Sequence, residues 1–188
     1  MNPKGVFFMK INHVYILVLT ALMTAVICVL APISVPVGPV PISLATFAVL
    51  LAAYMLGWKM GLCSVALYLL LGLIGVPVFA GYSAGLANLV GPTGGYLIGY
   101  LPLAFATGWA VERYHDAVRP VLGMIVGTLV LYVLGTAWLA LQMHMSFSQA
   151  LGAGVIPFLP GDAVKIVVTA VLGPILRTAL KKAGALEK

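Results

Sequence analysis

The chain has 188 residues, of which 63% are hydrophobic and only 7% are charged, and its formal net charge is +6. A soluble domain carries about 25% charged residues, and no soluble fold of this length can hide so much apolar surface. Nucleic-acid binding is excluded as well, because the basic residues are scattered between apolar segments and form no patch. The composition predicts an all-α integral membrane protein.

The first 12 residues precede the first apolar run, and we expect them to be a leader or a tag. The run that follows has the outline of a signal peptide, because it comes directly after Lys10. It lacks an A-x-A cleavage pattern, however, and further hydrophobic spans follow it. We therefore interpret it as the first transmembrane helix of a single membrane domain over residues 13–188.

Six apolar runs of suitable length divide the chain, since a helix needs about 20 residues to cross a bilayer. Segments rich in Pro and Gly separate the runs, as "APISVPVGPVP" does between the first and the second. The sequence predicts a bundle of six transmembrane helices at roughly 13–31, 42–58, 60–76, 93–112, 119–142 and 161–181.

The charged residues are distributed asymmetrically over this topology. Nine of the ten Lys and Arg residues fall on one side, and the three loops of the other side carry no Lys, Arg, Asp or Glu. The nine are Lys4, Lys10, Lys59, Arg113, Arg119, Arg177, Lys181, Lys182 and Lys188. Because cationic loops stay in the cytoplasm, both termini are predicted to be cytoplasmic.

Asp162 and Lys165, in "PFLPGDAVK", are the charges that remain outside this pattern, at the start of the sixth predicted helix. Residues three apart on a helix share a face. The helix dipole favours Asp162 in the first turn but not Lys165, whose burial costs about 2.5–3.5 kcal/mol at mid-bilayer and less near the edge. Either the pair only neutralises itself, or both side chains face a cavity and bind a polar ligand, which is the usual role of intramembrane ions.

A second polar cluster, "NLVGPTGGYLIGY", is expected on the same rim of the bundle. An Asn offers both a donor and an acceptor, glycines allow the backbone to approach a ligand, and a Thr can cap the fourth helix and leave its N–H groups free for an anion. The candidate ligand-binding residues here are Asn88, Gly91, Thr93, Gly94, Gly95 and Tyr96. Glycines in membrane helices also serve helix packing.

Several of these stretches resemble the BioY family, the biotin-binding substrate subunits of energy-coupling-factor (ECF) vitamin transporters. The matching pieces are "GPVPISL" at 38–44, "YLLLGLIGVPVFAG" at 68–81, "GPTGGYLIGY" at 91–100 and "PFLPGDAVK" at 157–165. The resemblance covers nearly the whole chain. It implies a subunit that binds biotin from outside with high affinity, and that assembles with a membrane coupling protein and two cytoplasmic ATPases. Ala21 and Ala25 resemble the small-residue motif that such subunits use against the coupling protein.

The ureido ring of biotin has two N–H donors and one strong acceptor. With this ligand, Asp162 can accept from an N–H, Lys165 can donate to the carbonyl, and Asn88 can complete either bond. The reverse pose, with Lys165 on the valerate carboxylate, stays open.

The sequence contains no nucleotide-phosphate loop, no HExxH and no G-x-S-x-G, so we expect no catalytic residues, no metal site and no cofactor. Cys28 and Cys63 lack metal-type spacing. Transport energy is therefore expected to come from partners. The runner-up is a self-sufficient carrier driven by protonation of Asp162; an intramembrane enzyme and a structural scaffold are the remaining classes.

Overall fold

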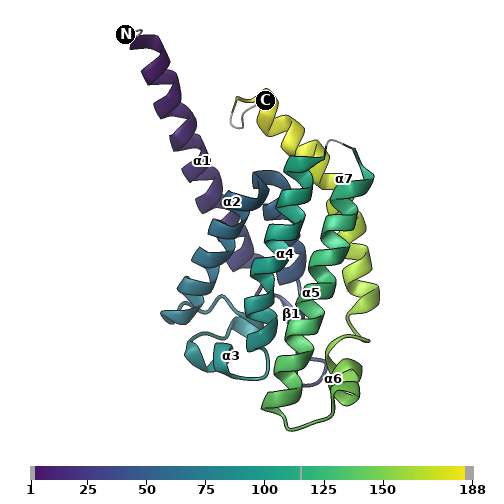
Figure 1. The fold of residues 1–188 in the computed structure, drawn as a ribbon. Coiled ribbons are helices and arrows are strands. Elements are labelled where there is room, and N and C mark those ends of the chain that lie inside the picture. The colour runs from purple at the N-terminus through teal and green to yellow at the C-terminus, as the bar shows by residue number, and fades with distance from the viewer. Residues whose placement is uncertain (1–2, 115, 185–188) are drawn as a thin grey trace.

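The computed structural model describes residues 3–114 and 116–184. Its helices are α1 (Pro3–Leu30), α2 (Ala45–Leu73), α3 (Leu86–Val90), α4 (Gly94–Arg113), α5 (Val118–Gln142), α6 (Phe147–Gly154) and α7 (Leu159–Lys182). Two short strands, β1 (Ser34–Val35) and β2 (Ile42–Ser43), and a 3-10 turn at Ala80–Tyr82 complete the described chain. The molecule is an elongated helical bundle (Figure 1).

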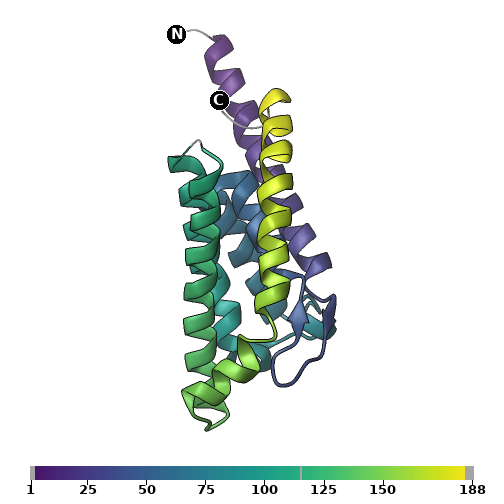
Figure 2. The same ribbon diagram turned by 90° about the vertical axis from the view of Figure 1, so that its right-hand side faces the viewer.

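The two ends of the bundle differ in content. One end gathers β1, β2, α3 and α6, and we call it the loop end (Figures 1 and 2). The other carries the first turns of α1 and the last turns of α4 and α7. We call it the basic end because Arg113 ends α4, Lys182 ends α7 and Arg119 lies in the first turn of α5. Lys59 lies there as well, two residues after Gly57, which packs against Glu112 of α4. Helices α4 and α7 both begin at the loop end, so their first turns open toward the same side of the molecule.

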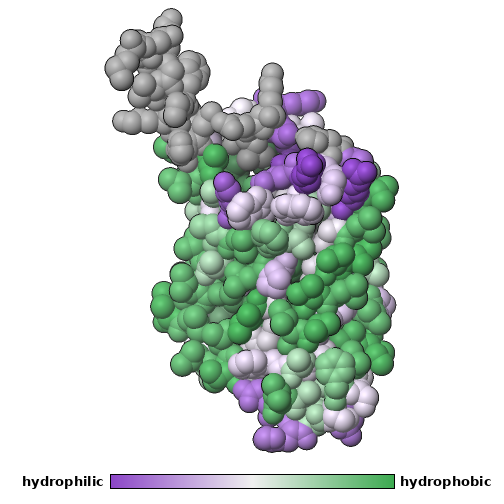
Figure 3. Space-filling model, viewed as in Figure 1, coloured by the Kyte–Doolittle hydropathy of each residue, from purple (hydrophilic) through white to green (hydrophobic). Residues whose placement is uncertain are grey.

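Apolar residues cover the middle of the face seen in Figure 3, and hydrophilic residues concentrate toward its two ends. Large apolar side chains on the outer helix faces are open to the surroundings, as at Val133 (60% exposed) and Val167 (62%). Within the described residues, α2, α5 and α7 are long and apolar enough to cross a membrane, and Val14–Leu30 is a shorter apolar helix. Long apolar helices with large apolar side chains exposed on their outer faces belong in lipid, which confirms the predicted helical membrane bundle.

A break at Gly57 divides α2 into two helical halves, 45–56 and 58–73. Gly57 has φ 79° and ψ −175°, a conformation that glycine adopts without steric cost. A Cβ built on Gly61 would lie 2.9 Å from the Cα atom of Ala53, whereas residues eight apart in a straight helix are about 12 Å apart. The chain therefore folds back at Gly57, and the halves correspond to the second and third predicted helices.

The predicted boundaries differ from the structure mainly at the N-terminal ends. α1 begins at Pro3, ten residues before the predicted start, so most of the expected leader has helical backbone; residues 1 and 2 lie outside the described residues. Ile42 and Ser43, predicted as helix, pair with β1 instead, in the register Ser34↔Ser43 and Val35↔Ile42. The remaining predicted helices agree with α4, α5 and α7 to within two residues.

Close helix contacts depend on small residues. A Cβ on Gly127 of α5 would lie 3.0 Å from a methyl group of Leu103 on α4, and a Cβ on Gly123 would lie 2.9 Å from the carbonyl oxygen of Ala106. On the other flank, the Ser64 hydroxyl of α2 donates to the Thr20 carbonyl of α1 at 3.1 Å. Small-residue packing and buried hydroxyl bonds are typical of helices that associate in lipid.

Candidate ligand-binding site

Asp162 and Lys165 face the inside of the bundle at the loop end. Asp162 lies in the first turn of α7, and Lys165 follows one turn deeper. The residues are 4% and 8% exposed, and the Lys165 Nζ lies 2.7 Å from Asp162 Oδ1. The pair is therefore turned away from lipid, and α7 alone fixes its spacing.

Three further elements supply hydrogen bonds to this pair. Lys165 Nζ donates to the Ser43 carbonyl of β2 at 2.8 Å and to the Thr46 Oγ1 of α2 at 3.3 Å. The Tyr132 hydroxyl of α5 donates to Asp162 Oδ2 at 2.6 Å. These bonds offset the cost of desolvating both ions, which is severe for a buried pair without partners.

Ser43, Thr46 and Tyr132 are site residues that the sequence reasoning missed. For Tyr132 a signal exists, because Thr128, Tyr132 and Thr136 recur every four residues along an apolar helix and so share one face. All three are buried, at 5%, 6% and 0% exposed. Of this polar stripe, Tyr132 is the residue that reaches the ion pair on α7.

The pair presents a carboxylate acceptor beside an ammonium donor, and its present partners are all neutral groups of the protein. A ligand can take the place of these partners only if it returns equivalent bonds, because hydrogen bonds to an ionised group are about twice as strong as bonds between neutral groups. A ligand that carries an N–H donor next to an oxygen acceptor can replace the Tyr132 hydroxyl and the Ser43 carbonyl while the ion pair persists.

Asn88 and Thr93 make their hydrogen bonds within the segment that precedes α4. Asn88 Nδ2 donates to the Ala84 carbonyl at 2.8 Å, and its Oδ1 accepts from the Ser83 hydroxyl at 3.0 Å. Thr93 stands at the N-cap position of α4 but gives no side-chain cap bond; its hydroxyl donates to the Asn88 carbonyl at 3.2 Å. The predicted position of the cap is right, and the predicted cap bond is wrong.

The glycine motif and Tyr96 anchor neighbouring helices. Gly94 and Gly95 pack closely on Trp138 of α5, whose Nε1 donates to the Gly91 carbonyl at 2.9 Å. The Tyr96 hydroxyl donates to the Gly154 carbonyl of α6 at 2.9 Å. Within residues 3–114 and 116–184, no hydrogen bond joins this cluster to Asp162 or Lys165, so the two predicted clusters share an end of the molecule but not a network.

Ala21 and Ala25 lie on the outer face of α1 and are exposed. The opposite face of α1 is buried, since Thr20 and Thr24 are 3% and 5% exposed, and the Thr24 hydroxyl lies 3.4 Å from the Ser64 carbonyl of α2. The two alanines form a shallow strip on which another helix can pack closely.

Comparison with known proteins gives consistent matches. The model described as "BioY family" matches residues 3–182. The chain is 38% identical over 173 residues to "Biotin transporter BioY2" of Lactococcus lactis subsp. cremoris (strain MG1363), covering 92% of this chain and 95% of that protein. It is 41% identical over 156 residues to "Biotin transporter BioY" of Thermotoga maritima, covering 83% and 92%. A crystal structure described as the S-component for biotin from an ECF-type ABC transporter superposes with a TM-score of 0.83 at 30% identity, covering 95% of each chain.

Proposed function

We propose, since the chain belongs to the BioY family, that this multi-pass protein of the cell membrane is the biotin-binding subunit of an ECF-type importer. It captures biotin from the outside and delivers it with an ATP-driven coupling module. The observation that carries the proposal is the buried Asp162–Lys165 pair, because intramembrane ions mark binding sites and the neutral partners of this pair can be exchanged for the donor and acceptor groups of a polar ring.

In the proposed complex, the ureido ring of biotin meets the ion pair. Asp162 accepts from a ring N–H, and Lys165 donates to the ring carbonyl. Asn88 is proposed as a further ureido contact, which requires that it exchange one of its present local bonds. The valerate chain then points to the rim formed by Gly91, Thr93, Gly94 and Tyr96.

The β1–β2 hairpin is proposed to close over this ligand. The Ser43 carbonyl of β2 bonds Lys165 directly, so the hairpin and the binding pair are mechanically linked. Prolines at 32, 36, 39 and 41 stiffen the segment, which allows it to move as a unit when the Lys165 bond is exchanged for a ligand bond.

The proposed energy source is a membrane coupling protein with two cytoplasmic ATPases, docked on the exposed Ala21–Ala25 strip of α1. The absence of a nucleotide-phosphate loop in the sequence supports this division of labour. A self-sufficient proton-coupled carrier makes a different prediction, namely biotin accumulation by this protein alone that an uncoupler abolishes. Uptake that depends on co-expressed ATPases and on ATP supports the coupled importer.

Six membrane crossings with both termini in the cytoplasm are part of the proposal, with residues 13–188 as a single domain. The crossings are α1, the two halves of α2, α4, α5 and α7. The support is the clustering of cations at the basic end. Cysteines introduced at Gly38 and Gly184 test it, since an impermeant thiol reagent added to intact cells should label the first and spare the second.

Isothermal titration calorimetry of the purified protein with biotin tests the site. Asp162→Asn and Lys165→Ala should each weaken binding at least about tenfold, because each leaves a buried polar partner unpaired at about 1–3 kcal/mol. Asp116→Asn, which removes an exposed carboxylate at the basic end, is the matched control and should bind as the wild type does. Wild-type affinity in either site variant would contradict the assignment.

A further inference from the structure

A groove of about 440 Å³ runs between α4 and α5 at the basic end. Phe105, Trp109, Leu122 and Val126 form its walls, and Ala106 and Gly123 lie where the two helices approach most closely. The groove exists because small residues pack at the helix contact while large ones flank it. It is distinct from the candidate biotin site, which lies at the loop end.

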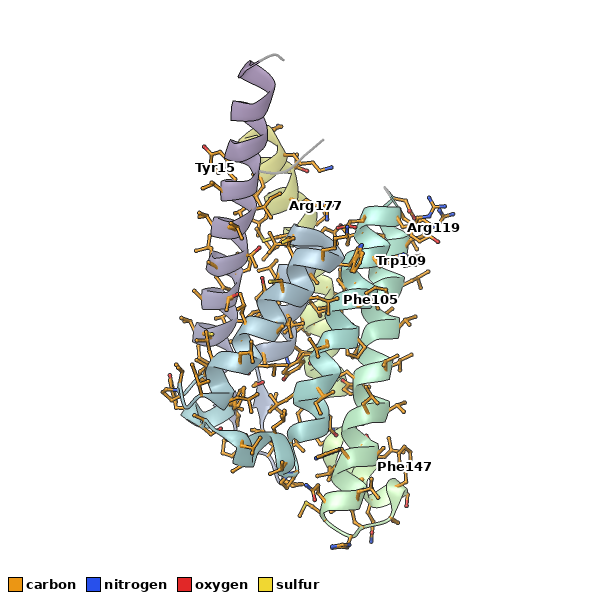
Figure 4. The ribbon with its side chains drawn as sticks, turned by 60° about the vertical axis from the view of Figure 1, so that its left-hand side comes forward. Tyr15, Phe105, Trp109, Arg119, Phe147 and Arg177 are labelled. Atoms are coloured by element: carbon orange, nitrogen blue, oxygen red, sulfur yellow. The ribbon has the colours of Figure 1, made fainter. Side chains whose placement is uncertain are left out.

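The groove opens toward lipid. Its four wall residues are 44%, 46%, 52% and 54% exposed, and Figure 4 shows Phe105 and Trp109 projecting outward from α4. A hollow on the membrane-facing surface of a bundle is filled by whatever adjoins it in the bilayer. Its apolar lining suits a hydrocarbon chain.

A cation stands at the mouth of the groove. Arg119 lies in the first turn of α5 (Figure 4), and its guanidinium carbon is 4.6 Å from the centroid of the Tyr114 ring. From Arg119 to Val126 the groove follows seven residues of α5, about 10 Å of helix. Tyr114 packs edge-on against Trp109 at 5.9 Å, so an aromatic wall connects the cation to the apolar part.

The guanidinium is available to a ligand. Among the described residues its ion-pair partner is Asp116, whose Oδ2 lies 4.0 Å from the Arg119 Nε, and the side chains of Arg119 and Asp116 are 60% and 45% exposed. Exposed pairs with this geometry contribute about 0–1 kcal/mol. The planar guanidinium of Arg can donate to two oxygens of a phosphate diester at once. A phospholipid therefore fits this site, with its phosphate on the guanidinium and an acyl chain in the apolar groove.

We propose that this groove binds an anionic phospholipid of the leaflet that faces the basic end, with one acyl chain between α4 and α5 and the phosphate on Arg119. Charge complementarity favours an anionic lipid, because Lys59 adds a second cation beside the groove. Its Nζ lies over the ring of Trp58, which packs edge-on against Phe105 at 5.6 Å. Basic pockets between helices on one membrane side are suited to such headgroups.

Fluorescence quenching by brominated lipids tests the site. In a variant with Trp58→Phe and Trp138→Phe, Trp109 is the sole reporter. The protein is placed in mixed phosphatidylcholine–phosphatidylglycerol vesicles in which only one of the two lipids is brominated. We expect phosphatidylglycerol to be preferred at Trp109 about fivefold over its bulk proportion, the effect of one basic residue near the surface. Equal quenching by both lipids would overturn the proposal.

Three variants in the same background locate the effect. Arg119→Gln should abolish the preference for phosphatidylglycerol. Arg113→Gln, the same change at an exposed arginine of α4 that does not line the groove, should retain it. Equal losses in both variants would indicate a general charge effect and contradict the site. Ala106→Phe should reduce quenching by either lipid, because its ring occupies the groove.

A competing occupant is a helix from a second copy of the chain. Val126→Cys in a Cys28→Ser, Cys63→Ser background reports it. A disulfide-linked dimer formed in phosphatidylglycerol-containing vesicles would place a second copy in the groove and overturn the lipid assignment, whereas a monomer agrees with it.

Discussion

Two Asp–base pairs with the same spacing stand at the starts of two helices in this molecule. Asp162 and Lys165 begin α7, with a separation of 2.7 Å and side chains 6% and 10% exposed. Asp116 lies two residues before α5 and Arg119 in its first turn, with a separation of 4.0 Å and side chains 45% and 60% exposed. Identical spacing thus produces a tight buried pair at the loop end and a loose exposed pair at the basic end.

The difference teaches that the surroundings, and not the spacing, decide what an ion pair does. The exposed pair lies within "ERYHDAVRP", a connection rich in other charges, whereas the buried pair lies in a segment with no other charge nearby. In water each ion keeps its hydration, so pairing adds little. Inside the bundle the protein must supply every partner, and removing one leaves a charge uncompensated.

The largest expected effect comes from breaking the buried pair. Lys165→Met keeps the side-chain length and removes the charge, which leaves the Asp162 carboxylate with Tyr132 as its remaining described partner. We expect a loss of about 3–5 kcal/mol in the free energy of unfolding, measured by denaturant titration in detergent. Arg119→Met is the matched change at the exposed pair and should cost less than about 1 kcal/mol. Equal losses would erase the distinction between the pairs.

A smaller effect is expected at the third partner of the buried pair. Tyr132→Phe removes the hydroxyl that donates to Asp162 Oδ2 at 2.6 Å and leaves the ring in place. A hydrogen bond to a charged group contributes about 1.5–3 kcal/mol, so the midpoint temperature of thermal unfolding should lie between those of the wild type and of Lys165→Met. Tyr54→Phe, at a buried tyrosine of the basic end far from the pair, controls for the loss of a hydroxyl in general. An unchanged stability in Tyr132→Phe would show that the carboxylate is satisfied without it.

The fold was largely predictable because each apolar run ends at Pro, Gly or charged residues. The fold-back at Gly57 follows from "GWKMG", and the structure places two helical halves around it. The start of α1 was not predictable in this way, since Lys4 and Lys10 indicate where the apolar run begins and not where the helical backbone begins. The short helix α6 did have a signal, the capping box of Ser146 and Gln149, which is weak beside the long apolar runs.

The site was predictable only in its charged half. Asp162 and Lys165 stand out because ions are rare in apolar helices. Their contact with Ser43 could not be predicted, because a backbone carbonyl is common to every residue and this one comes from 122 positions away. Asn88 and Thr93 looked like ligand groups from their types, yet in the structure they bond within their own loop, a use that polar residues before a helix share with any tight turn.

The smallest effect is expected at the exposed pair, where removing the charge of Asp116 tests how little that pair contributes. Asp116 has a second role, because its Oδ2 accepts from the backbone N–H of Arg119 at 3.2 Å at the start of α5. The amide oxygen of Asn can accept the same bond, so Asp116→Asn removes the charge and keeps the acceptor for the Arg119 N–H. We expect the free energy of unfolding to change by no more than about 0.5 kcal/mol, and that difference should vanish at about 1 M salt, where the Debye length is about 3 Å.

Asp162→Asn, measured alongside, should lose far more free energy of unfolding, and the loss should not depend on salt, because Lys165, the partner of Asp162, is shielded from dissolved ions. A large, salt-independent loss in Asp116→Asn would mean that the exposed pair is also closed off from water, and the contrast between the two ends would no longer hold.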